Sequence, residues 1–192
     1  MAWTSRALAL LPVIGLVIAQ SRPARADGDD RALSGYLGYA TFSEPGKPAH
    51  NQQSTTITPD FGITPSISYE HAFSSDFSLR GELGGAFFSG GQNINTKNTG
   101  TTSWMGMADV GITFRFDVLK YVPYAFGGLG GEYSTGGALD NGFVPVLVVG
   151  GGLDVLQSRS RSWGIEARVV GFATDTTVFT LSLRGTLRWG YL

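Results

Sequence analysis

Apolar and polar residues alternate along most of this chain with a period of two residues. Between Phe61 and Phe73, odd positions are mostly aromatic or aliphatic, whereas even positions are small or polar. Because successive side chains of a β-strand point to opposite faces, this pattern predicts strands with one apolar and one polar face. The pattern recurs and predicts eight strands, at 31–42, 61–73, 77–87, 104–116, 121–133, 143–155, 163–169 and 179–191.

The connections between these segments alternate in length. Long polar loops are expected at 43–58, 89–102 and 134–142, followed by a shorter one at 174–177, and short turns at 74–76, 117–120 and 157–162. An even number of strands, with long loops at one end and short turns at the other, is typical of outer-membrane barrels. We therefore predict an all-β fold, an eight-stranded antiparallel transmembrane up-and-down β-barrel whose short turns and chain ends face the periplasm.

Charged residues within the predicted strands share the polar face. An arginine or lysine on a lipid-facing surface costs about 2–4 kcal/mol at the bilayer midplane, so the charge-free face is expected to meet lipid. Arginine pairs with carboxylates in confined spaces, and narrow barrels fill their interior with side chains. The polar face thus predicts a structural charge network in the lumen, made of Glu70, Arg80, Glu82, Asp109, Arg115, Glu132, Asp154, Glu166, Arg168, Arg184 and Arg188.

Aromatic residues on the apolar face are sorted by height. The short-turn end is expected to carry Phe73, Phe77, Phe116, Tyr121, Trp163, Trp189 and Tyr191, and the long-loop end Phe61, Phe87, Trp104, Tyr133, Phe143 and Phe179. Aliphatic residues lie between these sets. Two aromatic girdles around an aliphatic belt are typical of a membrane-spanning barrel. This pattern disfavours the alternative of a soluble carrier barrel with an apolar interior.

The N-terminal segment differs from the rest of the chain. Arg6 precedes an uncharged apolar run at 8–19, and Ala24 and Ala26 form a small-x-small cleavage pattern, so 1–26 is predicted to be a signal peptide. The barrel would then occupy 27–192, exported through the general secretory route to the outer membrane. Residues 1–26 contain three arginines, at 6, 22 and 25, and no acidic residue. Their removal therefore changes the formal net charge from −1 to −4. A mildly acidic chain without a basic block is not expected to bind nucleic acid.

Two stretches resemble a known family. The run from Pro123 to Gly131, PYAFGGLGG, is similar to a strand of the small outer-membrane barrels of the OmpA/OmpX-like superfamily. The last strand, with Tyr191 as its penultimate residue, resembles the C-terminal signal of that superfamily. The resemblance implies contact with outer-membrane lipids and lipopolysaccharide, and recognition of the last strand by the barrel assembly machinery.

Catalytic chemistry is not indicated. The glycine clusters lack the spacing of a phosphate-binding loop, and His50 and His71 offer no spacing for a metal site. A lipid-A-modifying enzyme is disfavoured because His71, the sole strand histidine, would lie at the periplasmic end. We expect no enzyme activity and no cofactor or metal. The expected role is structural or surface-interacting, with exposed loops and a charge-filled lumen; the alternative is a small passive or gated porin-like channel.

Overall fold

The computed structural model describes residues 30–45, 56–59, 61–90, 102–116, 120–136, 139, 142–172 and 176–190. The segment predicted as a signal peptide lies outside the described residues, as do His50, Tyr191 and most of the predicted long loops. The strands are β1 (Arg31–Pro45), β2 (Thr56–Ile57), β3 (Phe61–Ala72), β4 (Phe77–Ser89), β5 (Ser103–Arg115), β6 (Tyr121–Thr135), β7 (Gly142–Leu156), β8 (Arg161–Phe172) and β9 (Thr177–Trp189). No helix in the described residues is long and apolar enough to cross a membrane.

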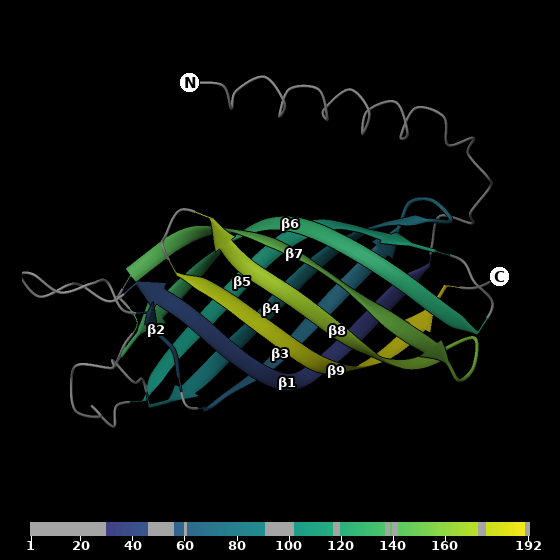
Figure 1. Cartoon of the computed structure of the whole chain (residues 1–192). Coiled ribbons are helices and arrows are strands. Elements are labelled where there is room, and N and C mark those ends of the chain that lie inside the picture. Colours follow the sequence, from purple (N-terminus) through teal and green to yellow (C-terminus); the bar gives the residue numbers. More distant parts are fainter. Residues whose placement is uncertain are drawn as a thin grey trace, which may run out of the picture.

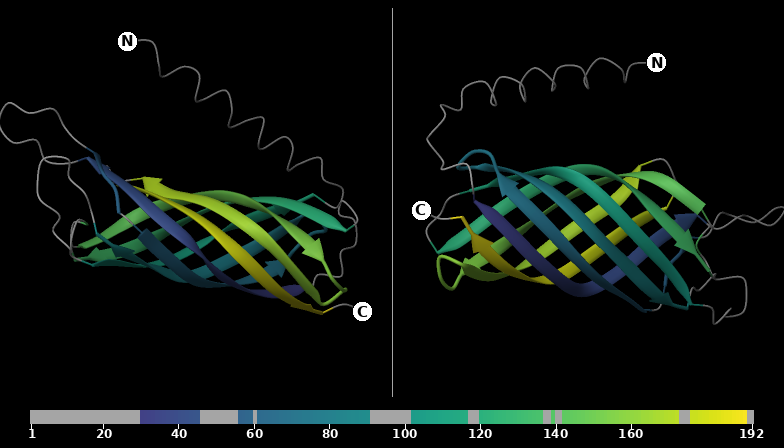
Figure 2. Two further views of the ribbon diagram at one scale, coloured as in Figure 1. Left: turned by 60° about the horizontal axis from the view of Figure 1, so that its bottom comes forward. Right: turned by 180° about the vertical axis from the view of Figure 1, so that it is seen from behind.

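The eight long strands form one closed antiparallel sheet (Figure 1). Each pairs with its neighbour in sequence, in the order β1-β3-β4-β5-β6-β7-β8-β9, and β9 pairs back with β1. The seam begins at the pair Arg31–Trp189, so the two described chain ends lie at the short-turn end of the barrel. The predicted eight-stranded up-and-down barrel is confirmed, and the further views in Figure 2 show the same tilted strands on both sides.

The first predicted loop is partly wrong. The structure extends β1 to Pro45 and adds the two-residue strand β2, both inside the segment predicted as the loop 43–58. Glu44 pairs with Ile57 and Pro45 with Thr56, so the hairpin continues past the barrel rim. Its outer part was missed because alternation weakens once no buried face distinguishes the two sides of a strand.

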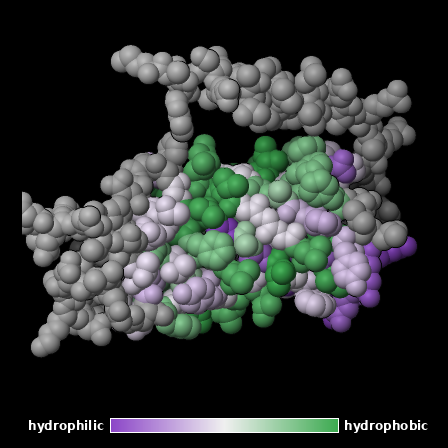
Figure 3. Space-filling model, viewed as in Figure 1, coloured by the Kyte–Doolittle hydropathy of each residue, from purple (hydrophilic) through white to green (hydrophobic). Residues whose placement is uncertain are grey.

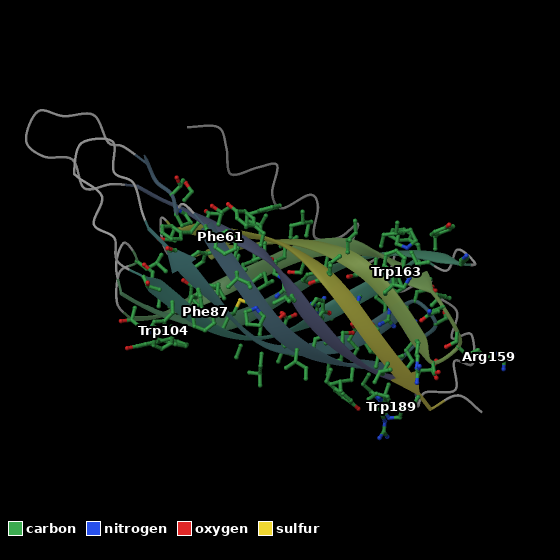
Figure 4. All side chains as sticks on the ribbon, turned by 90° about the horizontal axis from the view of Figure 1, so that it is seen from below. Phe61, Phe87, Trp104, Arg159, Trp163 and Trp189 are labelled. Carbon is green, nitrogen blue, oxygen red and sulfur yellow. The ribbon has the colours of Figure 1, made fainter. Side chains whose placement is uncertain are left out.

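Side chains of the long strands alternate between an exposed apolar face and a buried face. Leucine, isoleucine and valine side chains are exposed on the outside of the middle of the barrel, and on the face drawn in Figure 3 apolar residues form green patches among paler ones. Exposed aromatic residues flank this belt, with Phe61, Phe87 and Trp104 at the long-loop end and Trp163 and Trp189 at the other end (Figure 4). The arrangement has the two girdles and the aliphatic belt that suit a bilayer.

The outward face is not wholly free of charge. Arg31 and Arg161 are the first residues of β1 and β8, and both are exposed at outward positions of the short-turn end. Arg161 belonged to a predicted turn and Arg31 opens the predicted first strand. Both lie beyond the aliphatic belt, where long basic side chains reach the polar interface at small cost. The lipid-facing belt between the girdles thus keeps its apolar character.

Candidate functional site in the barrel lumen

All eleven residues of the predicted charge network point into the lumen, where nine of them form ion pairs. Nearest the short turns lies a group that we call the short-turn cluster, formed by Glu70, Arg115, Asp154, Arg184 and Arg188. Arg184 Nη2 lies 2.5 Å from Glu70 Oε1, and Arg188 Nη2 lies 2.9 Å from Asp154 Oδ2. Arg115 also pairs with Glu70.

Small residues on β1 make room for the arginines of the short-turn cluster. Ala32 and Ser34 point into the lumen and are buried, and Ala32 lies directly opposite Arg188 in the pairing of β1 with β9. The Arg184 guanidinium donates hydrogen bonds of 3.0 and 3.2 Å to Ser34 Oγ. The cluster holds three arginines and two carboxylates, and therefore a formal charge of +1.

The middle of the lumen holds a closed ring of ion pairs, the central ring, formed by Arg80, Glu82, Glu166 and Arg168. Arg80 Nη2 lies 2.5 Å from Glu82 Oε2 and 2.9 Å from Glu166 Oε1. Arg168 pairs with Glu82 and lies 2.6 Å from Glu166 Oε1 through Nη2. Each arginine thus contacts both carboxylates, so four buried charges neutralise one another.

Strand geometry explains the central ring. Arg80 and Glu82 are two residues apart on β4, and Glu166 and Arg168 are two residues apart on β8, so each strand presents an adjacent acid and base on one face. Strands β4 and β8 are not neighbours in the sheet, so these side chains meet across the lumen. Pairing and hydrogen bonding offset the cost of burying these four charges.

Aromatic side chains fill the space around the central ring. The Arg80 guanidinium lies 4.0 Å from the ring centre of Phe126 and 5.3 Å from that of Tyr36. The Tyr124 hydroxyl donates a hydrogen bond of 2.9 Å to Glu166 Oε2. These contacts combine cation–π attraction with an extra donor for a buried carboxylate.

The two remaining acids of the predicted network form no ion pair among the described residues. Asp109 lies directly opposite Glu82 in the pairing of β4 with β5, and its Oδ2 atom is buried without a hydrogen-bond partner there. Glu132 is buried on β6, near the long-loop end. Both side chains are buried on the inward face of their strands, and the sequence carried no information on which acids have partners.

A group of apolar side chains, which the sequence analysis did not predict, extends through the lumen from the central ring towards the long loops, where it lies beside the buried Glu132. We call this group the apolar cluster: Ala40, Phe42, Ala86, Phe88, Met105, Met107, Tyr124, Phe126, Leu139, Val146, Val148, Val170 and Val178. Phe42 and Phe88 pack edge to face with ring centres 4.9 Å apart. A usable signal was present, because Met105 and Met107 fall on the polar face of β5. On that face, residues change from charged to apolar towards the long loops.

A small cavity lies at the short-turn mouth of the lumen, and no metal-binding geometry is found among the described residues. A cavity at the short-turn mouth, bordered by Arg31, Glu70, Arg115 and Arg188, has a volume of about 30 Å³, which is room for roughly one water molecule. No three histidine, aspartate or glutamate side chains of the described residues could hold a metal ion. The arrangement is suited to filling the lumen.

Glycine on β7 makes room for the aromatic residues of the lumen. A Cβ atom on Gly150 would lie 2.5 Å from Phe126 Cζ and 2.6 Å from the Ala167 carbonyl oxygen. We expect Gly150→Ala to lower the free energy of unfolding by about 1–3 kcal/mol through overpacking, measured by urea titration of protein folded in lipid vesicles. Gly185→Ala is the matched control, since its Cβ would meet nothing within 4 Å. Equal stability of the two variants would contradict this packing argument.

Comparison with known proteins identifies the fold. No protein-family model matches the chain, and no curated protein sequence does. Among solved structures, the attachment invasion locus protein Ail of Yersinia pestis is 13% identical, covers 84% of this chain and 99% of its own, and has a TM-score of 0.55. Neisserial surface protein A is 13% identical over 83% of this chain and 97% of its own, with a TM-score of 0.58. The outer membrane protein AlkL is 18% identical over 90% and 97%, with a TM-score of 0.53.

The chain thus has the fold of the small eight-stranded outer-membrane β-barrels. The resemblance to this superfamily that the sequence suggested is confirmed at the level of fold. At these low identities the comparison supports the fold and carries no information about individual lumen contacts.

Proposed function

We propose that this protein is a non-enzymatic β-barrel of the bacterial outer membrane, with a closed lumen and a structural or surface-interaction role. The exposed aliphatic belt and its two aromatic girdles support insertion in a bilayer. The short-turn end would face the periplasm and the long loops the exterior. Outer-membrane phospholipid and lipopolysaccharide are the partners that such an apolar surface would contact.

The main support for a closed lumen is that side chains fill it along its length. The short-turn cluster and the central ring fill the lumen from the short-turn end to its middle, and the apolar cluster extends from the central ring towards the long loops, beside the buried Glu132. An ion crossing the barrel would have to break buried ion pairs and then pass the buried side chains of the apolar cluster. Both steps are costly, because unpaired charge and apolar surroundings are each unfavourable for an ion.

Conductance in planar bilayers tests the closed lumen. We expect purified, folded protein to give no sustained ion steps, whereas a porin added to the same bilayer as a positive control conducts. Folding is checked on the same sample by heat-modifiable migration on gels. Sustained steps from folded protein would overturn the closed lumen and favour the small channel instead.

Export and assembly form a separate part of the proposal. Residues 1–26 would direct secretion and be removed, leaving 27–192 as the barrel, and the last strand would be recognised by the barrel assembly machinery. The alternating apolar pattern of β9 supports this role. N-terminal sequencing of protein from isolated outer membranes is expected to begin at Asp27. A mature protein that keeps residues 1–26 would contradict it.

A further inference from the structure

A hollow of about 580 Å³ lies on the outward wall of the barrel. It crosses β1 and β3 to β6, strands that face the reader in the right-hand view of Figure 2. Its walls are the outward side chains of Leu33, Ile67, Tyr69, Leu83, Val110 and Leu129. Between them it is also bordered by Ser68, Glu82, Asp109 and Gly130, residues on the inward face of the same strands. Because the wall residues belong to the lipid-facing surface, the hollow opens towards the membrane rather than into the lumen.

Two small residues at outward positions produce the hollow. Gly81 lies between Tyr69 on β3 and Val110 on β5 in the strand pairing, and Ala108 lies opposite Leu83. A Cβ atom added to Gly81 would meet nothing within 4 Å. The floor therefore carries no side chain larger than the methyl group of Ala108, while large residues surround it.

The hollow runs from the short-turn girdle towards the middle of the barrel. The rings of Tyr69 and Trp189, a residue of that girdle, have centres 6.4 Å apart, and Leu129 lies near the middle of β6. Five neighbouring strands contribute outward residues, which at about 4.8 Å per strand gives a length of roughly 19 Å. One hydrocarbon leaflet is about 15 Å deep, half of a bilayer core of about 30 Å. The length of the hollow thus matches an oblique path across one leaflet of the bilayer.

We propose that this hollow binds an acyl chain of a phospholipid whose head group lies beside Tyr69 and the girdle residue Trp189. The inference rests on the proposed location in the outer membrane, where the short-turn side faces the phospholipid leaflet. Within a bilayer, apolar surfaces associate by close packing, because lipid tails are as apolar as leucine. An unfilled hollow forfeits those dispersion contacts, and a slender, flexible chain can follow it. A second barrel is convex and would bridge the hollow without filling it.

Filling the floor of the hollow tests the proposal. The protein is folded into vesicles of phosphatidylethanolamine and phosphatidylglycerol, extracted in detergent, and analysed by native mass spectrometry for phospholipid retained per protein. We expect one retained phospholipid for the unchanged protein and about tenfold lower occupancy for Gly81→Leu, since the leucine takes the space of the packed chain. Ala108→Leu is a second filling variant, expected to act alike. Gly185→Leu is the matched control, with the same open surroundings for a Cβ elsewhere on the barrel.

The outcomes separate the lipid site from the proposed function. Equal retention in Gly81→Leu, Ala108→Leu and Gly185→Leu, or no retention in the unchanged protein, would overturn the acyl-chain site. A protein dimer that both filling variants abolish would overturn it too, in favour of a second copy. Flotation of the same samples with vesicles measures membrane insertion independently of lipid retention. A protein that does not float would contradict the proposed function, whereas a protein that floats without retaining lipid would contradict the acyl-chain site alone.

Discussion

Replacement of Arg80 by methionine is expected to lower the free energy of unfolding by about 3–5 kcal/mol, the usual cost of removing one partner from a buried ion pair. Arg80 contacts both carboxylates of the central ring and stacks on Phe126. Without it, Glu82 and Glu166 would have Arg168 as their one ion-pair partner among the described residues, and Glu166 would keep its hydrogen bond from Tyr124. Methionine keeps much of the apolar stem, so the loss would report charge and hydrogen bonding more than volume. Urea titration in lipid vesicles, followed by tryptophan fluorescence, measures it.

Two further variants show whether the loss of stability in Arg80→Met comes from the central ring. Arg159→Met removes an exposed arginine from the turn between β7 and β8 and is expected to change stability by no more than about 0.5 kcal/mol. The double variant Arg80→Met with Glu166→Gln leaves Arg168 paired with Glu82 and should recover much of the loss. If Arg80→Met were as stable as Arg159→Met, the central ring would make no contribution to stability.

Replacement of Leu183 by arginine is expected to cost about 2–4 kcal/mol in lipid vesicles, the cost of a basic side chain at the bilayer midplane. Leu183 is the central residue of β9 and is 67% exposed on the outward face. Because no neighbouring side chain covers it, a soluble barrel would tolerate the change. The size of the effect therefore measures how deeply this face lies in lipid.

The matched control is Thr177→Arg on the same face of the same strand. Thr177 is the first residue of β9 and lies exposed at the long-loop end. Near the interface the cost of arginine falls to about 0–1 kcal/mol. Urea titration of both variants in the same vesicles gives the comparison. Equal costs at the two depths would contradict the bilayer position of the girdles.

The alternation of residues was sufficient to predict the strands and the face of each side chain. Leu79, Leu83 and Phe87 share one face of β4 and Arg80 and Glu82 the other, and a shift of one residue would turn every arginine towards lipid. The cost of arginines in lipid excludes the shifted assignment of faces. The barrel and the residues on its inner face could therefore be inferred from the sequence. Strand ends were less certain, because loops impose no such cost.

The identity of partners within the lumen could not be predicted in the same way. Arg80 and Glu166 are 86 residues apart in the chain and meet because β4 and β8 face each other across the closed barrel. Periodicity assigns a face but gives no information on height or on the opposite strand. For the same reason the apolar cluster was missed: Phe42 and Phe88 come from strands whose buried faces meet at the long-loop end.

The seam between β1 and β9 constrains the order in which this protein can assemble. Thirteen residue pairs, from Arg31–Trp189 to Ser43–Thr177, join the first long strand to the last. Until β9 is in place, both edges of the sheet carry unpaired backbone groups, which hydrocarbon cannot satisfy. No stable intermediate with only the first few strands can therefore span a bilayer, and insertion must be coupled to closure. Membrane entry is consequently a single late event that waits for the end of the chain.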